Sequence, residues 1–292
     1  MKISLVTTYP KAEEVARIKE ESLLAGHEFN LIDFNSFKFN VVHGKINMQD
    51  FSDLEADVII IRGIFVAIHA LTPLIDFLHN RKIKVFDNKL STHKYAINKI
   101  ADFMKLSVAK VAIPDTYYSR SFDDYSQFAD KLGYPVVVKS TRMGKGASVV
   151  KIDSKSELDK FISEYMVRED KDNSKDLIMQ KFIDYKYDLR VFVMGEHMFC
   201  MRRIPSGDDF RANFSLGGSV EPFNLNESLV RLSKRAIEAV NLDVAGVDIL
   251  LDKDNNPYIL EVNHTPGMVG IERATGENIS KMYLEYAIKH AK

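Results

Sequence analysis

Hydrophobic and polar positions follow two different periods along the first 90 residues. Two stretches, residues 11–27 and 66–80, place apolar residues at the spacing of an amphipathic helix. Four short apolar runs predict β-strands: residues 2–8, 28–34, 56–63 and 82–87. Strands separated by helices favour a small parallel α/β domain, which we place at residues 1–90.

The next part of the chain, residues 91–180, has the pattern of a strand pair with helices. Its expected elements are helices at residues 91–106, 122–133 and 154–166 and strands at residues 134–140 and 149–152. Ser91 and Thr92 are residue types that favour a helix start. Ser154 and Glu157 have the spacing of a capping box.

The last part, residues 181–292, contains longer strands. Strands are expected at residues 176–183, 187–195, 197–204, 245–251 and 257–263, with helices at residues 226–242 and 276–291. Gly195 and Glu196 predict a tight hairpin turn between two of these strands. Residues 205–223 are polar and rich in glycine, which predicts a loop.

Polar side chains interrupt two of these apolar strands. Glu261 and Asn263 lie two residues apart on the last strand, so they point to the same face. If the preceding turn is centred between Asp254 and Asn255, Asp248 lies directly opposite Glu261. A one-residue change in turn length brings Asp248 nearer to Asn263.

Carboxylates this close raise each other's pKa unless a cation is present. Mg²⁺ prefers oxygen ligands, uses one or two carboxylates and leaves positions for water and phosphate. An ordinary solvated strand face is the alternative, but it does not explain why polar residues interrupt such apolar strands. The pattern therefore predicts a metal site made by Asp248, Glu261 and Asn263.

A magnesium–nucleotide site also needs residues that contact phosphate. Lys139 ends an apolar strand, and the loop TRMGKGAS that follows contains Arg142, Gly144, Lys145 and Gly146. Small residues let backbone N–H groups approach phosphate oxygens, although neither a Walker A nor a dinucleotide-binding glycine motif occurs. Taken alone, this loop is weak evidence, and a surface β-turn is the more common explanation.

Three further segments carry candidate cations. Lys99 lies in a helix, where a lysine is ordinarily solvated. Arg211 and Asn213 alternate with phenylalanines in the glycine-rich loop, after Arg202 and Arg203. A guanidinium group offers two parallel donors to a phosphate or a carboxylate, so this segment suits an anionic ligand.

Composition narrows the class of protein. The 292 residues carry a formal net charge of −1, so no global basic field points to nucleic acid. The single cysteine, Cys200, excludes an intramolecular disulfide and, within an apolar strand, is interpreted as a core residue. No apolar run reaches the ~20 residues of a membrane span. We expect a cytoplasmic protein with no membrane or nucleic-acid partner, either monomeric or a homo-oligomer.

Together these segments resemble the ATP-grasp superfamily and, within it, the RimK-like α-L-amino-acid (glutamate) ligases. The resemblance is carried, in this order, by MQKFI, DLRVFVMG, RRIPSGDDFRANFSLGG, AGVDILL and LEVNHTPGMVGIERATGENIS. It implies an α+β fold in which an N-terminal pre-ATP-grasp α/β domain precedes two α+β subdomains that clasp ATP between them.

The resemblance also implies roles for single residues. Asp248, Glu261 and Asn263 match the family's Mg²⁺ ligands, with two ions expected and Mn²⁺ as an option. The residues that it assigns to ATP are Lys99, Lys139, Gly144, Lys145, Gly146, Gln180, Lys181, Phe182, Ile183, Asp188, Arg211 and Asn213. Of these, Lys139, Arg211 and Asn213 are expected to act in catalysis, facing the reacting phosphate.

The reaction that the resemblance implies is ADP-forming ligation of a carboxylate to an amine. The carboxylate is activated as an acyl phosphate and joined to an amino acid, expected to be glutamate, on a peptide or protein C-terminus or a small-molecule acceptor. Arg202, Arg203 and Arg62 are candidate contacts for an acidic substrate. A glutathione-synthetase-like or dipeptide ligase and a catalytically inactive ATP-binding regulatory protein are the alternatives.

Overall fold

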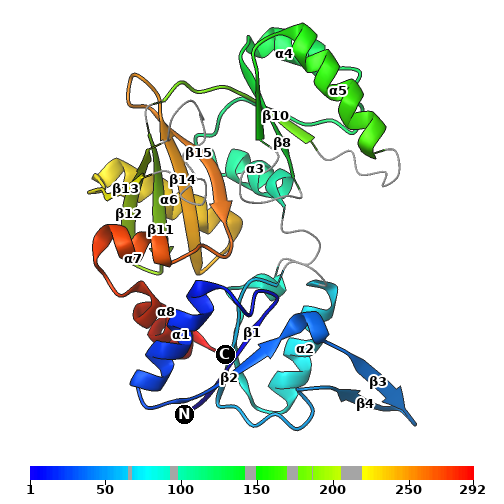
Figure 1. Ribbon diagram of the computed structural model, residues 1–292, viewed down its shortest axis with the longest axis vertical. Helices are drawn as coiled ribbons and strands as arrows, with labels where there is room; N and C mark the ends of the chain where they lie inside the picture. Colours follow the sequence, from blue (N-terminus) through cyan, green and yellow to red (C-terminus); the bar gives the residue numbers. More distant parts are fainter. Residues whose placement is uncertain (65–67, 93–97, 142–148, 170–176, 186, 205–218) are drawn as a thin grey trace.

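The N-terminal unit is built on a parallel sheet, as predicted. The computed structural model describes residues 1–64, 68–92, 98–141, 149–169, 177–185, 187–204 and 219–292 (Figure 1). The elements of this unit are β1 (Lys2–Thr7), α1 (Glu13–Leu24), β2 (Glu28–Asp33), β5 (Val58–Ile61), α2 (Ile68–Asn80) and β6 (Lys84–Phe86). The strand order is β2-β1-β5-β6. All of β5 is buried, as a strand covered on both faces should be.

Two small elements of this unit escape sequence periodicity. The hairpin of β3 (Phe39–Val42) and β4 (Lys45–Met48) projects away from the parallel sheet (Figure 1), and η1 (Phe34–Ser36) precedes it. Its turn residues, His43 and Gly44, have φ angles of 50° and 73°, as a two-residue hairpin turn requires. Seven of its eight strand residues are exposed, so no buried face marks it in the sequence.

The second sheet is antiparallel and has helices on one face (Figure 1). Its strands, in the order β7-β10-β8-β9, are β7 (Thr116–Tyr117), β10 (Leu177–Lys181), β8 (Val136–Ser140) and β9 (Val149–Ile152). Helices α4 (Tyr125–Leu132) and α5 (Lys155–Glu169) cover it. The predicted capping box starts α5: Ser154 Oγ accepts from Glu157 N at 3.3 Å. The Glu157 carboxylate reaches one residue further back than predicted, to Asp153 N at 2.9 Å.

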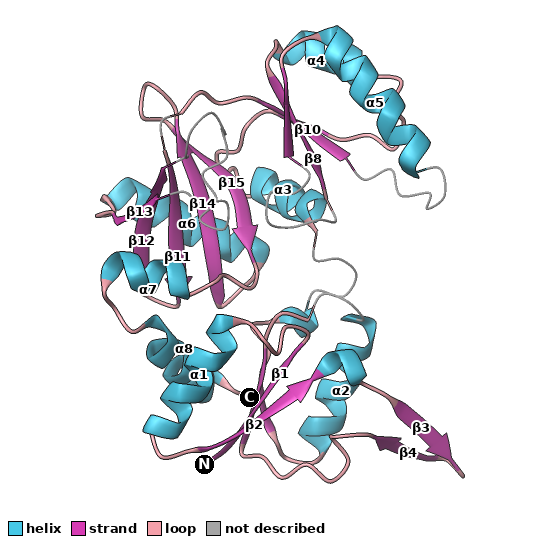
Figure 2. Ribbon diagram, viewed as in Figure 1, coloured by secondary structure: helices cyan, strands magenta, loops and turns pink. Residues whose placement is uncertain are grey.

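The third sheet is antiparallel, with strand order β13-β12-β11-β14-β15 (Figure 2). Its strands are β11 (Asp188–Met194), β12 (His197–Ile204), β13 (Ser219–Pro222), β14 (Val244–Leu251) and β15 (Pro257–Asn263), and α6 (Glu227–Val240) covers one face. Met194 pairs with His197, so the predicted hairpin at Gly195-Glu196 is confirmed. The loop predicted at residues 205–223 is corrected at its end, where β13 pairs with the edge of β12.

Two helices differ from the prediction: one begins later than expected, and the other was not predicted. α3 (Lys99–Val108) begins at Asn98, whose Oδ1 accepts from Ala101 N at 2.8 Å, and not at Ser91 or Thr92, which lie in the short turn η2 (Leu90–Thr92). α7 (Val269–Thr275) is too short for its period to be recognised. α8 (Ile279–His290) lies within the helix predicted at residues 276–291 and packs against α1.

The packing of α3 and α8 crosses the division of the chain predicted at residues 90 and 180. α3 contacts α6 and β15 of the third sheet, and α8 returns to the N-terminal unit (Figure 1). Beyond α8, Lys292 and Val85 exchange two backbone hydrogen bonds of 2.8 and 3.0 Å. Both ends of the chain are therefore anchored to the same parallel sheet.

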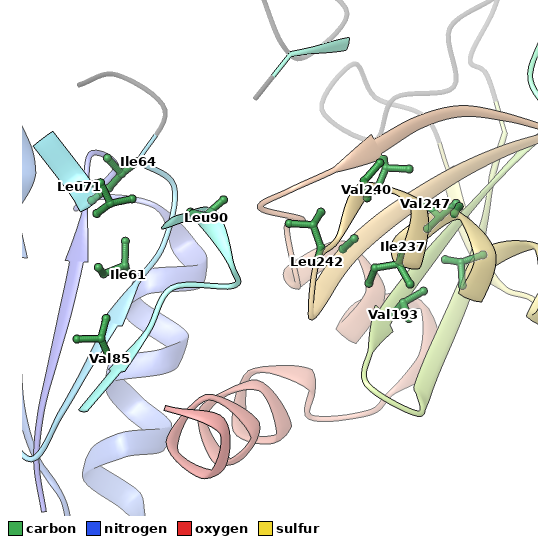
Figure 3. Packing of buried hydrophobic residues seen from close by; sticks show 14 of the residues in the cluster. Ile61, Ile64, Leu71, Val85, Leu90, Val193, Ile237, Val240, Leu242 and Val247 are labelled. Atoms are coloured by element: carbon green, nitrogen blue, oxygen red, sulfur yellow. The ribbon is translucent and has the colours of Figure 1, made fainter. Parts of the chain in front are cut away.

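Buried apolar residues join the N-terminal unit to the third sheet. Figure 3 shows one cluster in two groups, with Leu90 of the first facing Leu242 of the second. A second cluster joins Phe86 of the N-terminal sheet to Phe192 and Met194 of β11. One face of β11 is therefore apolar at one end and available to polar residues at the other. None of the described helices is both long and apolar enough to cross a membrane.

Candidate functional site

The two carboxylates of the predicted metal site lie on paired strands. Asp248 on β14 is directly opposite Glu261 on β15, which is one of the two arrangements that the sequence leaves open. The turn is one residue tighter than that arrangement assumes, since Leu251 pairs with Pro257. An extra residue at Leu260 restores the register. The predicted pairing is therefore reached through a β-bulge.

Asn263 completes the predicted set of oxygen ligands. It lies two residues beyond Glu261, so both side chains leave the strand on the same face. Its Oδ1 accepts a hydrogen bond from Thr265 N at 2.9 Å, which holds the side chain near the end of the strand. The amide oxygen therefore lies on the face that carries Asp248 and Glu261.

Two arginines neutralise Asp248 from neighbouring strands. Arg190 on β11 is directly opposite Asp248, and its Nη2 donates to Oδ2 at 2.8 Å while its Nε contacts Oδ1. Arg203 on β12 donates from Nε and Nη2 to the two oxygens of Asp188, at 2.5 and 2.9 Å. The same Nη2 lies 3.1 Å from Asp248 Oδ2. Two acidic and two basic side chains, all little exposed, thus pair with one another across β12, β11 and β14.

Burial and charge act in opposite directions on these two carboxyl groups. Burial alone would raise the pKa of Asp248, but the guanidinium groups of Arg190 and Arg203 hold it below its ordinary value. Burial raises the pKa of Asp188 to about 6, because Arg203 offsets only part of the penalty and Asp248 adds repulsion. The arginines therefore supply part of the compensation that the sequence argument assigns to a metal ion.

Both predicted ATP lysines interact electrostatically with the carboxylates of the third sheet. Lys99 is the first residue of α3, and its Nζ lies 3.6 Å from Glu261 Oε2. Lys139 on β8 donates to Gln180 Oε1 at 2.7 Å. Burial and the charge of Lys99 lower the pKa of Lys139 to about 8, against the opposing effect of Glu261 and Asp248. Helix α3 and strand β8 of the second sheet therefore contribute cations near the carboxylates of the third sheet.

The remaining residues assigned to ATP are placed as follows. Gln180 is buried and its Nε2 donates to Thr116 Oγ1 at 2.8 Å. Lys181 is exposed at the end of β10, Phe182 and Ile183 are half-buried, and the Lys151 ammonium group lies 4.9 Å from the centre of the Phe182 ring. Arg142, Gly144, Lys145, Gly146, Arg211 and Asn213 lie outside the described residues, so their roles stay predictions.

The arginines predicted to contact an acidic substrate occupy three different environments. Arg203 belongs to the buried charge cluster on β11, β12 and β14. Arg62 is buried, donates to the Pro266 carbonyl and lies 5.0 Å from the centre of the Tyr283 ring. Half-buried Arg202 pairs with Glu221 and lies 5.0 Å from the centre of the Tyr187 ring. Their contact with substrate stays a prediction.

The donor set fits a hard divalent cation with few protein ligands. Across the part of the chain that the structure describes, no three His, Cys, Asp or Glu side chains gather as a metal-binding group. The predicted set is two carboxylates and an amide oxygen, which suits Mg²⁺ because this ion keeps water and phosphate oxygens among its ligands. Lys99 and Lys139, beside the same carboxylates, suit those phosphates.

The charge cluster also explains the state of Cys200. The residue is buried, as predicted for a core position. Burial and the nearby carboxylate of Asp188 raise the pKa of the Cys200 thiol to about 12, against a smaller effect of Arg203. The thiol is therefore protonated near neutral pH and is not a nucleophile.

Arg190 and the pair formed by Asp102 and His264 were not predicted from the sequence. Arg190 shares its strand face with Asp188, two residues away, so the rule that found Glu261 and Asn263 could have found it. Asp102 and His264 are 162 residues apart in sequence, and their side chains lie within 2.9 Å. No local pattern marks such a pair.

Comparison with known families decides what this arrangement belongs to. Residues 96–287 match the RimK-like ATP-grasp domain. The chain belongs to the RimK-like ATP-grasp family. The predicted family, the α+β ATP-grasp fold and the class of ATP-dependent carboxylate–amine ligases are thereby confirmed.

Relatives of this RimK-like protein match it along its whole length. It is 28% identical to a probable alpha-L-glutamate ligase of Marinobacter nauticus, over 100% of this chain and 97% of the relative. It is 27% identical to a protein of the same name from Legionella pneumophila strain Corby, with the same coverage.

Two solved structures share its fold. ATP-grasp ligase PsnB, complexed with a phosphomimetic variant of its minimal precursor, Mg and ADP, superposes with a TM-score of 0.74. Its identity is 16%, over 99% of this chain and 98% of PsnB. The RimK domain ATP-grasp protein of Sphaerobacter thermophilus superposes with a TM-score of 0.71 at 17% identity, over 98% of this chain and 99% of that one.

Proposed function

We propose that this RimK-like protein uses Mg-ATP to join a carboxylate to the amine of an amino acid, releasing ADP and phosphate. The observation that carries the proposal is the convergence of Lys99 and Lys139 on the carboxylates Asp248 and Glu261. Lysines attract phosphate groups and carboxylates hold a divalent cation, so one place suits both parts of Mg-ATP. PsnB, which was solved with Mg and ADP, has the same fold, and this supports Mg-ATP as the bound nucleotide.

In the proposed reaction, an oxygen of the substrate carboxylate attacks the γ-phosphorus of ATP. The bond from that phosphorus to the ADP oxygen breaks, and an acyl phosphate forms. The amine of the amino acid then attacks the acyl carbon, loses a proton and displaces phosphate. Each step moves negative charge among oxygens, so fixed positive charge near them is the main contribution that the chain can make.

The chain supplies this charge from helix α3 and from strand β8. Lys99 and Lys139 place ammonium groups beside the reacting phosphoryl group, and we assign Arg211 and Asn213 to the same task on the strength of the resemblance. A divalent cation bound through Asp248, Glu261 and Asn263 would neutralise charge on the phosphate oxygens. The paired arginines on β11 and β12 hold Asp248 in one orientation before any ligand arrives.

We propose an acidic amino acid, with glutamate first, as the amine substrate, and a peptide or other carboxylate as the acceptor. Two relatives are named as probable alpha-L-glutamate ligases, and macrocyclase MdnC was solved with its precursor peptide. Arg202 is the candidate contact. Among the described residues its buried Nε has no hydrogen-bond partner, so one donor of the guanidinium group is unused.

Kinetics of an Arg202→Met variant test this assignment. The variant should raise the KM of one substrate about tenfold, the value of one charged hydrogen bond, and leave the other KM within twofold. Unchanged KM values for both substrates would remove Arg202 from the site.

Four further expectations stay predictions: a second metal ion, the use of Mn²⁺, homo-oligomer formation and a cytoplasmic location.

A ligation assay tests the proposed function itself. Purified protein is incubated with Mg-ATP, each of the twenty amino acids and a panel of peptides and small carboxylates, with phosphate release and product mass both measured. We expect phosphate only when an amine and a carboxylate are both present, together with a product heavier by one amino-acid residue. Phosphate release at the same rate with and without the amine and the carboxylate would contradict the proposal. Glu261→Ala, folded but without turnover, is the control.

A further inference from the structure

A buried pair at the end of β15 takes no part in the proposed chemistry. His264 follows Asn263 directly, and Asp102 lies on α3. His264 Nε2 and Asp102 Oδ2 are 2.9 Å apart, and the two residues are only 5% and 8% exposed. A polar pair in such surroundings is costly to separate, because each group would lose its partner without gaining water. The contact therefore fixes the distance between α3 and the end of β15.

This pair lies beside the contact between Lys99 and Glu261. Lys99 and Asp102 are three residues apart on α3, so they share one face of the helix. Glu261 and His264 are likewise three residues apart, at the end of β15 and just beyond it. Two contacts, of 3.6 and 2.9 Å, thus join the same helix face to the same strand end. Only the second is buried.

The two contacts differ in exposure, and this difference indicates which of them fixes the position of α3. Glu261 is 37% exposed on its side chain, so water and a bound cation compete with Lys99 for it. The Lys99 side chain is also long and flexible, and it gains little from a loose ion pair. The first turn of α3 is therefore held in place by Asp102 and not by Lys99.

We propose that Asp102 and His264 are positioning residues: their contact holds the first turn of α3 against β15 and keeps the Lys99 ammonium group at the phosphate site. The inference rests on the proposed function, since it presumes that Lys99 contacts ATP. Its distinctive consequence is that the pair acts on ATP affinity through Lys99 alone.

The opposite end of α3 provides a matched control. Arg235 on α6 donates from Nη2 to the carbonyls of Ala109 and Lys110, both at 2.8 Å, just beyond the last turn of α3. Arg235→Met therefore loosens the attachment of the same helix at the end remote from Lys99. A general effect of helix docking would appear in this variant too, whereas positioning of Lys99 would not.

The experiment is a double-mutant cycle on the dissociation constant of Mg-ATP, measured by calorimetry on the full chain. His264→Ser should raise this constant about tenfold, the value of one lost hydrogen bond of ~1.4 kcal/mol. In a Lys99→Met background the same substitution should change it by less than twofold. Asp102→Asn, which keeps shape but loses charge, should raise it about threefold. Arg235→Met should leave it unchanged.

Each other result overturns the inference. An equal factor for His264→Ser in both backgrounds means that His264 acts independently of Lys99. In another outcome, Lys99→Met raises the dissociation constant of Mg-ATP tenfold while His264→Ser and Asp102→Asn leave it at the wild-type value. That result overturns the inference and leaves the proposed function standing. A wild type without measurable affinity for Mg-ATP overturns the proposed function and this inference with it.

Discussion

Lys139 is a residue whose protonation links the site to pH. Burial and the neighbouring Lys99 lower the pKa of its ammonium group to about 8, although Glu261 and Asp248 oppose the change. In the ligand-free protein the group is therefore charged at pH 7 and largely neutral at pH 9. At high pH, binding of a phosphate ligand that needs the charged form is therefore coupled to uptake of a proton by Lys139.

The affinity for Mg-ATP should consequently fall as pH rises. Between pH 7 and pH 9 the dissociation constant should increase about tenfold, because the charged fraction of Lys139 falls by that factor. Calorimetry at constant free Mg²⁺ measures this. Lys139→Arg keeps its charge throughout and should show no such rise. A wild type whose affinity is the same at both pH values would separate Lys139 from phosphate binding.

At this scale the sequence supplies faces but not partners. The two-residue spacing of Glu261 and Asn263 is enough to place both oxygens on one side of a strand. The partner of Arg190 is Asp248, 58 residues further along the chain, and its identity depends on which strands become neighbours. The sequence can therefore place Arg190 on a strand face, but it cannot identify Asp248 as the partner of that arginine.

Strand β14 has no room for a side chain at Gly246 when Arg190 is paired with Asp248. A Cβ at this position would lie 2.9 Å from Arg190 Nη1 and 2.9 Å from Pro266 Cβ. Arg190 cannot move aside freely because Asp248 holds it at two points, and the proline ring is rigid. The glycine therefore provides the space in which Arg190 crosses the strand to reach its partner.

Gly246→Ala should lower the free energy of unfolding by about 1–3 kcal/mol, the usual cost of overpacking a core. It should also weaken Mg-ATP binding, because Arg190 is displaced from Asp248. Urea denaturation and calorimetry measure the two effects. Gly267→Ala is the control: its Cβ would meet Glu14 Oε1 at 2.8 Å, the end of a side chain that can shift. Equal losses for both variants would contradict the argument.

The elements divide into those with a readable period and those without. Long strands and helices such as β11 and α6 lie where their apolar spacing predicts them. β13 and α7, with four and seven residues, are too short for a period to show. The start of α3 was misplaced because Ser91 and Thr92 have the right side chains for a cap, but Asn98 makes the capping bond.

At the scale of the whole molecule, Asn88 joins the N-terminal unit to the third sheet. Its Nδ2 donates to the carbonyls of Val244 and His264, at 2.7 and 3.0 Å. Its Oδ1 accepts from the N–H groups of Asp243 and Val244, at 3.0 and 2.6 Å. One buried amide thus serves four backbone groups at the edge of the hairpin formed by β14 and β15.

Asn88→Gly should lower the free energy of unfolding by about 2–4 kcal/mol, because the substitution leaves several buried backbone groups without partners. It should also reduce the cooperativity of unfolding, seen as a broader or divided transition in urea. The asparagine has a φ of 53°, which glycine adopts without strain. Asn255→Gly, at a φ of 62° in an exposed turn, controls for backbone freedom and should cost less than 1 kcal/mol. Similar losses for both would exclude the amide contacts as the cause.

The arrangement of whole units lies beyond what local pattern can predict. The sequence separates a parallel α/β unit from two α+β parts, and the described residues form one parallel sheet, two larger antiparallel sheets and the β3-β4 hairpin. The return of α8 to the first sheet and the docking of α3 on the third depend on contacts such as that of Val85 with Lys292. Residues so far apart meet only once the folded units have formed.

The central claim is that Glu261, with Asp248 and Asn263, holds the divalent cation that carries ATP to Lys99 and Lys139. Its most direct test compares ATP binding with and without Mg²⁺ in wild type and Glu261→Gln. We predict that Mg²⁺ strengthens ATP binding at least tenfold in wild type. In the variant this gain should disappear while the free energy of unfolding stays within ~1 kcal/mol. A Glu261→Gln variant that binds Mg-ATP as tightly as wild type would contradict the account.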